Sequence, residues 1–565
     1  MASSKKLFHS DMLYILPIGG CGQFGGNMTF YGMNGDWVVV DCGAAFADER
    51  MPGVDLMMPN PSGIPAQCRK GIKALVITHA HEDHVGGVVT LWPELGYPDI
   101  YASPFAHEVL LRKFSEAQYK QRPTIITFEP EEVLPFGDME FIPVSVSHSI
   151  PEAHGLFIRT PIGTVLHSGD WNIDPSPVLG EKTRKEVFER YAGEDGILAY
   201  VGDSTNAESD GISPSERDAA EGLEGAFKEC KGKIAITIFS SNISRIHSIC
   251  KAAQKVGRHV ALAGRSLEAM AQNAQSCGYL EDIPPFVDVR DMASLPKNKQ
   301  VYIITGSQGE GRASLAKIAQ GAHKHISLKK GDHVMFSARK IPGNERAISD
   351  LMNLLISAGV EVITPKDHMI HVSGHPYKGE IETMLEWVRP KIMIPVHGEK
   401  TQMMAQGKIA TMPDGSNRVI EVCVPDNGAL MQVSPDGAEI VARYDCPMRP
   451  VVFGDVVDPD YAPLRDRKKV SFHGCVFVSL FVNSETTEME ELNLSVVGLL
   501  DLDRPEHQKL YDKCAQSMEE GFYRLSQRDR INPEKVEKEI TNQARRFFRN
   551  VFDVKPLVEL HISIG

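Results

Sequence analysis

Short apolar runs separated by glycine- and proline-rich turns dominate the first 200 residues of the chain. Because these runs are continuous rather than alternating, they predict strands that are buried on both faces. After the run KALVIT (73–78) and the six residues that follow it, a helix is expected over VGGVVTLWPEL (85–95). The predicted strands are LYILPI (13–18), MTFYGM (28–33), WVVVDCG (37–43), KALVIT (73–78), MEFIPVSVS (139–147), TVLHSGD (164–170) and ILAYVGDS (197–204).

From about residue 215 to 370 the pattern changes to strict alternation of strand and helix. Four apolar runs each precede a helical pattern, such as the patterns at 242–257 and 344–359. This alternation predicts a parallel sheet covered by helices on both faces. The four strands are expected over KIAITIF (233–239), HVALAG (259–264), VYIITG (301–306) and DHVMFSA (332–338).

The order of these patterns predicts a first domain that is interrupted by a second. We expect the first domain over residues 1–214 and 368–450, with the alternating α/β domain inserted over 215–367. Residues 451–469, rich in proline and charge, are expected to be a linker. A small α+β domain is expected over 470–565, with two strands, two helices and a last strand. Its apolar strands suggest a self-association surface, so we expect a homodimer or homotetramer.

Composition narrows the class of protein further. Hydrophobic residues make up 42% of the chain and charged residues 24%, as in globular proteins. The chain has no apolar run long enough to span a membrane and no signal-peptide pattern, so we expect a cytoplasmic protein without membrane contact. Its ten cysteines are scattered along the chain, and we expect them to be reduced. The net charge of −14 makes a polyanionic substrate less expected. We therefore expect a locally basic channel between the first two domains, and a uniformly negative cleft would count against an RNA substrate.

The stretch THAHEDHVGG (78–87) carries the strongest chemical signal. His79 and His81 lie on one side of an extended backbone, and Asp83 and His84 follow as the chain turns into the predicted helix. A lone histidine is more often a core residue, but this cluster supplies ligands for two adjacent metal sites. Nitrogen and carboxylate donors suit Zn²⁺ or Mn²⁺, with Mg²⁺ as an alternative, and the lack of cysteine donors argues against a structural zinc site.

Further metal ligands are available where later strands end. His148, Asp170 and His397 each follow an apolar run, and a carboxylate such as Asp170 is suited to bridge two ions. Two adjacent divalent ions lower the pKa of water and stabilise the attacking and leaving oxygens of a phosphodiester. Asp83 would orient or deprotonate that water. His375 would protonate the leaving 3′ oxygen or stabilise the transition-state charge.

These motifs, in this order, resemble those of the ribonuclease J family, in the β-CASP branch of the metallo-β-lactamase superfamily. The resemblance rests on THAHEDHVGG, GDSTNA, FSSNISR, GRS, TGSQGE, HVSGH and PVHGE, and it covers essentially the whole chain. It implies an αβ/βα sandwich with an inserted β-CASP parallel α/β domain and a small C-terminal α+β domain. It also implies a metal-dependent ribonuclease of RNA maturation, including rRNA maturation, and of mRNA decay, with single-stranded RNA as substrate and RNA-degradation proteins as partners.

The resemblance also assigns roles to individual residues. His79, His81 and His148 would hold one metal, Asp83, His84 and His397 the other, and Asp170 would bridge them. Asp41 would orient the metal-binding loop without being a ligand. Asp203 matches the first acidic motif of the β-CASP branch, and we assign its histidine motif to His375 rather than His371.

A pocket for a 5′-monophosphate is a further implication, and it would account for 5′-to-3′ exonuclease action with internal cutting as a second activity. The candidate phosphate contacts are Ser240, Asn242, Arg265, Ser373, Gly374 and His375. Small-residue turns usually have no ligand, and Arg265 would serve equally well in a structural salt bridge. The glycine-rich run GGCGQFGGN (19–27) lacks the Lys-Ser/Thr pair of a phosphate loop and predicts only a turn.

Two other functions fit the sequence less well. One is another hydrolase of the same superfamily, such as a DNA-processing nuclease; the preference for RNA rests on the resemblance alone. The second is a non-catalytic RNA-binding scaffold that has kept the fold. That alternative is disfavoured because every expected ligand position holds a residue of the expected type.

Overall fold

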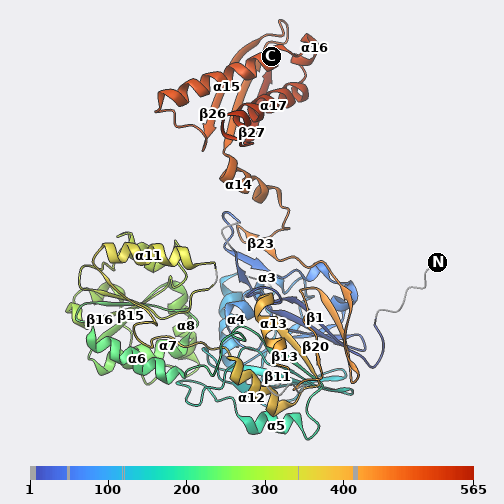
Figure 1. Cartoon of the computed structure of the whole chain (residues 1–565), viewed down its shortest axis with the longest axis vertical. Helices are drawn as coiled ribbons and strands as arrows, with labels where there is room; N and C mark the ends of the chain where they lie inside the picture. Colours follow the sequence, from blue (N-terminus) through green and yellow to red (C-terminus); the bar gives the residue numbers. More distant parts are fainter. Residues whose placement is uncertain (1–7, 48–50, 118, 120, 342, 412–417) are drawn as a thin grey trace. The chain divides into compact units, whose positions relative to one another are not determined.

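The computed structural model describes residues 8–47, 51–117, 119, 121–341, 343–411 and 418–565. The chain forms two compact units (Figure 1). The first comprises residues 1–46 and 56–449, and the second comprises residues 47–55 and 450–565. None of the helices in the described part of the chain combines the length and apolar composition that crossing a bilayer requires. All ten cysteines are free.

The first unit is built on a sandwich of two mixed sheets. The eight-stranded sheet has the order β22-β21-β1-β2-β3-β6-β7-β8, and the seven-stranded sheet has the order β20-β19-β13-β12-β11-β10-β9. The strands of the first sheet are β1 (Leu13–Gly19), β2 (Met28–Met33), β3 (Asp36–Val40), β6 (Ile72–Val76), β7 (Asp99–Ala102), β8 (Ile125–Thr127), β21 (Ala429–Ser434) and β22 (Gly437–Arg443). Those of the second are β9 (Leu134–Phe136), β10 (Met139–Val146), β11 (Ala153–Thr160), β12 (Gly163–His167), β13 (Ala199–Asp203), β19 (Ile392–Val396) and β20 (Glu421–Val422).

Apolar side chains from both sheets form the core between them. Val38 and Val76 of the first sheet share one buried cluster with Phe141 and Ile158 of the second. The outer face of the second sheet is covered by α5 (Lys185–Ala192) and α12 (Lys378–Val388), and the segment after α13 (Lys400–Lys408) completes this cover. Strands buried on both faces explain why these runs are continuously apolar.

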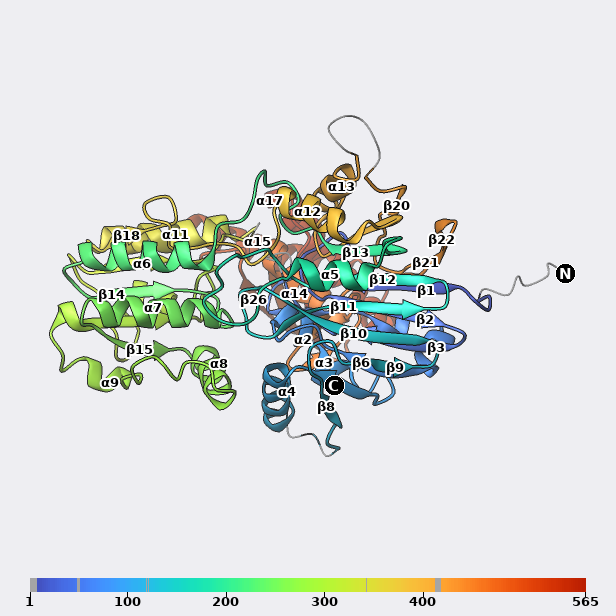
Figure 2. The ribbon, with the colours of Figure 1, turned by 90° about the horizontal axis from the view of Figure 1, so that it is seen from below.

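Inserted between β13 and β19 is a five-stranded sheet in which every pair of neighbours is parallel, as predicted. In Figure 1 the strands lie between α11 (Glu345–Ser357) above and α6 (Glu216–Glu229) and α7 (Ile243–Lys255) below, and Figure 2, seen from below, shows α6 and α7 side by side. Apolar residues of α10 (Ser314–Ala319) and α11 (Glu345–Ser357) pack on the sheet. The order is β15 (His259–Ala263), β16 (Gln300–Ile304), β14 (Ile234–Thr237), β17 (His333–Phe336), β18 (Glu361–Ile363).

The second unit contains a three-stranded sheet with β25 (Cys475–Val482) between β26 (Met489–Val497) and β27 (Leu557–Ile564). Helices α15 (Pro505–Tyr523) and α17 (Pro533–Phe552) bury one face of this sheet, through residues such as Phe522 and Phe548. The segment predicted as a linker, 451–469, contains β24 (Asp455–Val456) and the start of α14 (Ala462–His473).

The helix predicted over residues 85–95 is wrong in its bounds, since two short helices replace it. They are α2 (Glu82–Val85) and α3 (Val88–Leu91). The carbonyl of Asp83 accepts a hydrogen bond from the Asn27 backbone (2.9 Å), and Gly87 N donates to the Cys42 carbonyl (2.9 Å). These groups are therefore not available to each other for a continuous helix.

Candidate metal centre and substrate cleft

The predicted metal ligands follow the ends of strands from both sheets. His79 and His81 lie in the extended segment after β6, and Asp83 and His84 lie in the single turn of α2. His148 follows β10, Asp170 follows β12 and His397 follows β19. The turn of α2 can lie this close to Gly43 because position 43 is a glycine. A Cβ there would lie 1.7 Å from the carbonyl oxygen of Asp83.

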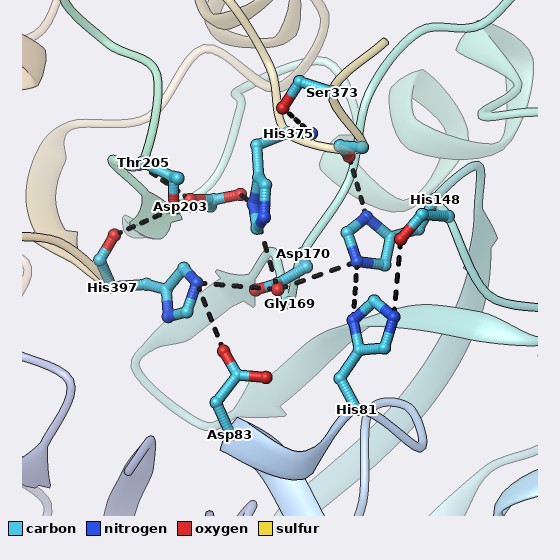
Figure 3. A network of polar contacts seen from close by, with 12 residues as sticks. His81, Asp83, His148, Gly169, Asp170, Asp203, Thr205, Ser373, His375 and His397 are labelled. Atoms are coloured by element: carbon cyan, nitrogen blue, oxygen red, sulfur yellow. Dashed lines mark hydrogen bonds and ion pairs between the residues drawn. The ribbon is translucent and has the colours of Figure 1, made fainter. Parts of the chain in front are cut away.

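The structure brings all seven predicted ligands together in two sets that share Asp170. In each set the ligand atoms lie within 4.8 Å of one another. Figure 3 shows Asp170 between His148 on one side and His397 on the other. The first set is His79, His81, His148 and Asp170, and the second is Asp83, His84, Asp170 and His397.

Histidine nitrogens converge on one oxygen of Asp170. Oδ2 lies 3.3 Å from His84 Nε2, 3.5 Å from His397 Nε2 and 3.6 Å from His79 Nε2. In the first set, His81 Nδ1 lies 3.1 Å from His79 Nε2 and 3.0 Å from His148 Nε2. Burial, with the neighbouring histidines, lowers the pKa of His79 and His81 well below the usual value, so both rings are neutral. Neutral imidazoles whose nitrogens converge in this way are suited to hold a cation between them.

Asp170 provides an independent test of whether the residues fit metal ions. Both of its carboxylate oxygens are buried, and neither has a hydrogen-bond partner in the described part of the chain. Although burial favours the protonated acid, His397 and His84 hold the pKa of Asp170 well below its usual range. A buried carboxylate without a donor is costly unless a cation compensates it. The nitrogen and oxygen donors present suit a divalent metal of the zinc or manganese class.

Comparisons with known proteins agree with this geometry. A family model of the beta-lactamase superfamily domain matches residues 36–223, and one of the ribonuclease J beta-CASP domain matches 231–355. A model of the Zn-dependent metallo-hydrolase RNA specificity domain matches 359–412, and one of the ribonuclease J C-terminal domain matches 462–563. Ribonuclease J of Sinorhizobium meliloti is 36% identical over 570 residues, which cover 99% of each chain. The chain belongs to the ribonuclease J family.

A second relative and one solved structure extend the comparison. Ribonuclease J of Synechocystis is 30% identical and is matched over 99% of this chain and 88% of its own. The crystal structure of a protein of unknown function from Enterococcus faecalis superposes with a TM-score of 0.52 at 14% identity. It covers 75% of this chain and 100% of its own, and at this identity it shows the fold alone. The expected family and the expected sandwich with its β-CASP insertion are confirmed.

Two residues outside the ligand sets hold the ligands in place. The Asp41 carboxylate lies 2.7 Å from His84 Nδ1 and accepts from both the backbone and the hydroxyl of Thr78 (2.8 Å each). Asn27, which the sequence analysis did not identify, accepts at Oδ1 from His397 Nδ1 (2.7 Å). Such partners fix the tautomer and orientation of ligand histidines. A Cβ on Gly20 (φ +80°) would lie 2.2 Å from Asn27 Oδ1, so the glycine-rich run leaves room for this amide.

Asp203 and His375 form a pair beside the second ligand set (Figure 3). His375 Nδ1 lies 2.7 Å from Asp203 Oδ2 and 3.8 Å from Asp170 Oδ2. Burial opposes the charged form of His375, but Asp203 and then Asp170 raise its pKa to about 9. The structure therefore places His375, and not His371, against the acidic residues of the site. His371 instead lies next to Arg245.

The predicted phosphate contacts fall in three places. Ser373 and Gly374 precede His375 in one loop, where Ser373 Oγ accepts from Asn206 Nδ2 (2.8 Å) and the Gly374 carbonyl accepts from His148 Nδ1 (2.7 Å). Ser240 and Asn242 follow β14, but Asn242 is buried and caps α7. Arg265 begins α8 (Arg265–Ser276) and is exposed, and among the described residues it has no salt-bridge partner within 4.0 Å.

Charge around the site is mixed. A cavity of about 370 Å³ beside His148 is lined by Glu129, Glu152 and Glu181, and its described lining includes no Lys or Arg. The expected basic channel is therefore not found in this cavity. A basic side chain lies near the loop instead, where Arg339 donates to the side chain of Asn206.

Proposed function

We propose that this chain, a metal-dependent ribonuclease by family, removes nucleotides from the 5′ end of single-stranded RNA. It favours a 5′-monophosphate end and also cuts RNA internally, in RNA maturation and decay. The observation that carries the proposal is the pair of ligand sets sharing Asp170, with the Asp203–His375 pair and the 373–375 loop beside them. A bimetallic centre next to a turn of small polar residues suits a phosphodiester near a terminal phosphate.

Two divalent ions, Zn²⁺ or Mn²⁺, are assigned to the two ligand sets. When bound, they supply Lewis acidity and a more acidic water to phosphodiester hydrolysis. His79, His81 and His148 would hold one ion, Asp83, His84 and His397 would hold the other, and Asp170 would contact both. The carboxylate of Asp41 and the amide of Asn27 keep His84 and His397 directed at the centre.

The protein's own groups then orient water and move protons. The side chain of Asp83 is 32% exposed, so an incoming water can reach its carboxylate, which would orient the water and accept a proton from it. That water attacks phosphorus as the bond to the 3′ oxygen of the terminal nucleotide breaks. His375, fixed at Nδ1 by Asp203 and 21% exposed, donates a proton to the leaving 3′ oxygen. The products are a 5′-mononucleotide and an RNA that again begins with a 5′-phosphate.

The 5′-phosphate is assigned to the loop of Ser373, Gly374 and His375 and to the turn at Ser240 and Asn242. Ser373 is held there by Asn206, whose amide also donates to the His375 carbonyl (3.2 Å). Because the Asn242 side chain already caps α7, its contribution would come from the backbone of the turn. Arg265, exposed at the start of α8 and without a salt-bridge partner among the described residues, is the cation of this set that would contact the phosphate.

Self-association is assigned to the second unit. Helices cover one face of its sheet, while Phe477 on β25 points away from that core and is 48% exposed. We assign the contact of a homodimer or homotetramer to this face of the sheet, which the helices leave uncovered. The cytoplasm, where RNA-degradation proteins would be partners, is the assigned compartment.

The test uses four single strands with a tritium label in the first nucleoside: 5′-monophosphate, 5′-triphosphate and 5′-hydroxyl RNA, and matched 5′-monophosphate DNA. Wild type and His81→Ala are compared with Mn²⁺ and with chelator. We expect labelled mononucleotide mainly from monophosphate RNA, lost with chelator and in the variant. Equal cutting of DNA would favour the DNA-processing nuclease. RNA binding without cleavage in any metal would favour the scaffold and overturn the proposal.

A further inference from the structure

Arg245 in α7 is a fully buried arginine whose partners come from three other segments. Its side chain is 0% exposed, and its guanidinium forms a two-point ion pair with Glu216 of α6, through Nε to Oε1 (2.7 Å) and Nη2 to Oε2 (2.8 Å). Glu216 is itself held, because its backbone donates to Asp174 (2.9 Å). Buried arginines are rare unless they are paired in this way.

The third guanidinium nitrogen of Arg245 contacts the loop that carries Ser373–His375. Nη1 donates to the Ile370 carbonyl (2.7 Å), which also accepts from Ser337 Oγ (2.6 Å). Ser337 follows β17, and its backbone donates to Thr237 at the end of β14 (3.0 Å). The first residue of the loop is therefore fixed to the end of the inserted parallel sheet.

Through its backbone, Arg245 is also tied to the other half of the proposed phosphate pocket. Arg245 N donates to Asn242 Oδ1 (2.8 Å), which caps α7 directly after the Ser240–Asn242 turn. One residue thus joins the turn after β14 to the start of the 370–375 loop. Because all three guanidinium nitrogens already donate within the protein and the side chain is buried, Arg245 is not placed to contact a phosphate itself.

We propose that Arg245 is a positioning residue that sets the spacing between the two halves of the 5′-phosphate pocket, and so determines the preference for 5′-monophosphate ends. This inference rests on the proposed function. Lysine cannot replace it, since one ammonium group cannot reach both Glu216 oxygens and the Ile370 carbonyl in this fixed geometry. The far end of the loop is held separately, by Asn206 at His375 and by Asp203.

The experiment compares Arg245→Lys, Ser337→Ala and wild type in three assays. The first two assays measure kcat/KM on 5′-monophosphate RNA and on 5′-hydroxyl RNA. The ratio of these two values measures what the terminal phosphate contributes. The third is hydrolysis of bis(p-nitrophenyl) phosphate, which has no terminal phosphate group and reports on the metal centre. Arg449→Lys is the matched control, because Arg449 is 8% exposed, pairs with both oxygens of Glu94 and belongs to neither half of the pocket.

We expect Arg245→Lys to lower the monophosphate-to-hydroxyl ratio by about tenfold or more, because the Ser240–Asn242 turn at the start of α7 would shift relative to the 373–375 loop. Displacements near 1 Å can cost about a hundredfold in rate. Ser337→Ala removes one of the two donors to the Ile370 carbonyl, so it should lower the same ratio by a smaller factor. This variant keeps the test informative if Arg245→Lys fails to fold. Hydrolysis of the small diester should stay within about twofold of wild type in folded variants, because the residues at the metal centre keep their partners. Arg449→Lys should not change the ratio.

Two results would overturn the inference. One is an unchanged ratio in folded Arg245→Lys and Ser337→Ala. The other is a parallel fall in all three assays, which a general loss of structure explains. If wild type itself shows no preference for the monophosphate end, the proposed pocket is wrong, and the inference falls with it.

Discussion

Replacing Gly374 by alanine should weaken metal binding without unfolding the protein. A Cβ at this position would lie 2.7 Å from Nδ1 and 2.8 Å from Cε1 of His148, and 3.1 Å from Ser149 N. Ordinary van der Waals contact begins at about 3.4 Å, so the His148 ring must move by about 0.7 Å. The loop cannot easily retreat instead, because Asn206 holds Ser373 and His375 on either side.

A shift of this size exceeds the tolerance of about 0.2 Å for metal–ligand distances. It also disturbs the 2.7 Å hydrogen bond between His148 Nδ1 and the Gly374 carbonyl. Loss of such an outer partner typically costs 10–100-fold in metal affinity, which is about 1.4–2.7 kcal/mol. We therefore expect that loss for the ion assigned to His79, His81 and His148.

The assay is titration of Zn²⁺ into the metal-stripped protein in competition with a chromophoric chelator. Gly225→Ala is the matched control, because no atom lies within 4 Å of its added Cβ and its position in α6 favours alanine. The control should bind metal as wild type does and melt slightly higher. Wild-type affinity in a folded Gly374→Ala variant would refute the assignment of His148 as a ligand.

Three further predictions follow from single contacts. Asn27→Ala removes the acceptor of His397 Nδ1 and should lower metal affinity about 10–100-fold in the same titration; an unchanged affinity would exclude Asn27 from this role. Asn242→Ala removes the cap of α7 and should cost about 1 kcal/mol in denaturant unfolding, whereas no loss would show that the cap is dispensable. For His154, burial lowers the pKa to about 4. The unfolded chain, with a histidine pKa of about 6.5, therefore binds the proton first, and stability is lost as pH falls from about 6.5 towards 4. His154→Leu should remove up to about 2 kcal/mol of the stability difference between pH 7.5 and pH 5, and an identical pH slope in both proteins would contradict this.

The sequence predicted those parts of the site that have a local signature. His79, His81, Asp83 and His84 fall within six consecutive positions after an apolar strand, and a strand end directs such residues to one edge of the sandwich. His148, Asp170 and His397 also follow buried strands, so their convergence follows from the fold.

Other residues carry no local signature because their partners are distant in sequence. Asn27 contacts His397, 370 positions away, and its glycine-rich surroundings predict only a turn. Arg245 lies in an amphipathic helix, where an arginine is expected at the surface, and only the fold brings Ile370 and Glu216 to it. The break between α2 and α3 likewise depends on Asn27 and Cys42, which pair with backbone groups that a continuous helix would use.

The most direct test of the account is the number of divalent ions bound per chain, measured by elemental analysis after metal loading and dialysis, alongside cleavage of 5′-monophosphate RNA. We expect about two ions in wild type and about one each in His148→Ala and His397→Ala, with cleavage lost in both variants. Asp170→Asn, which alters the shared ligand, should retain the fewest ions. A wild-type chain that cleaves RNA at full rate with a single ion, or variants that keep both ions, would contradict a two-metal centre built around Asp170.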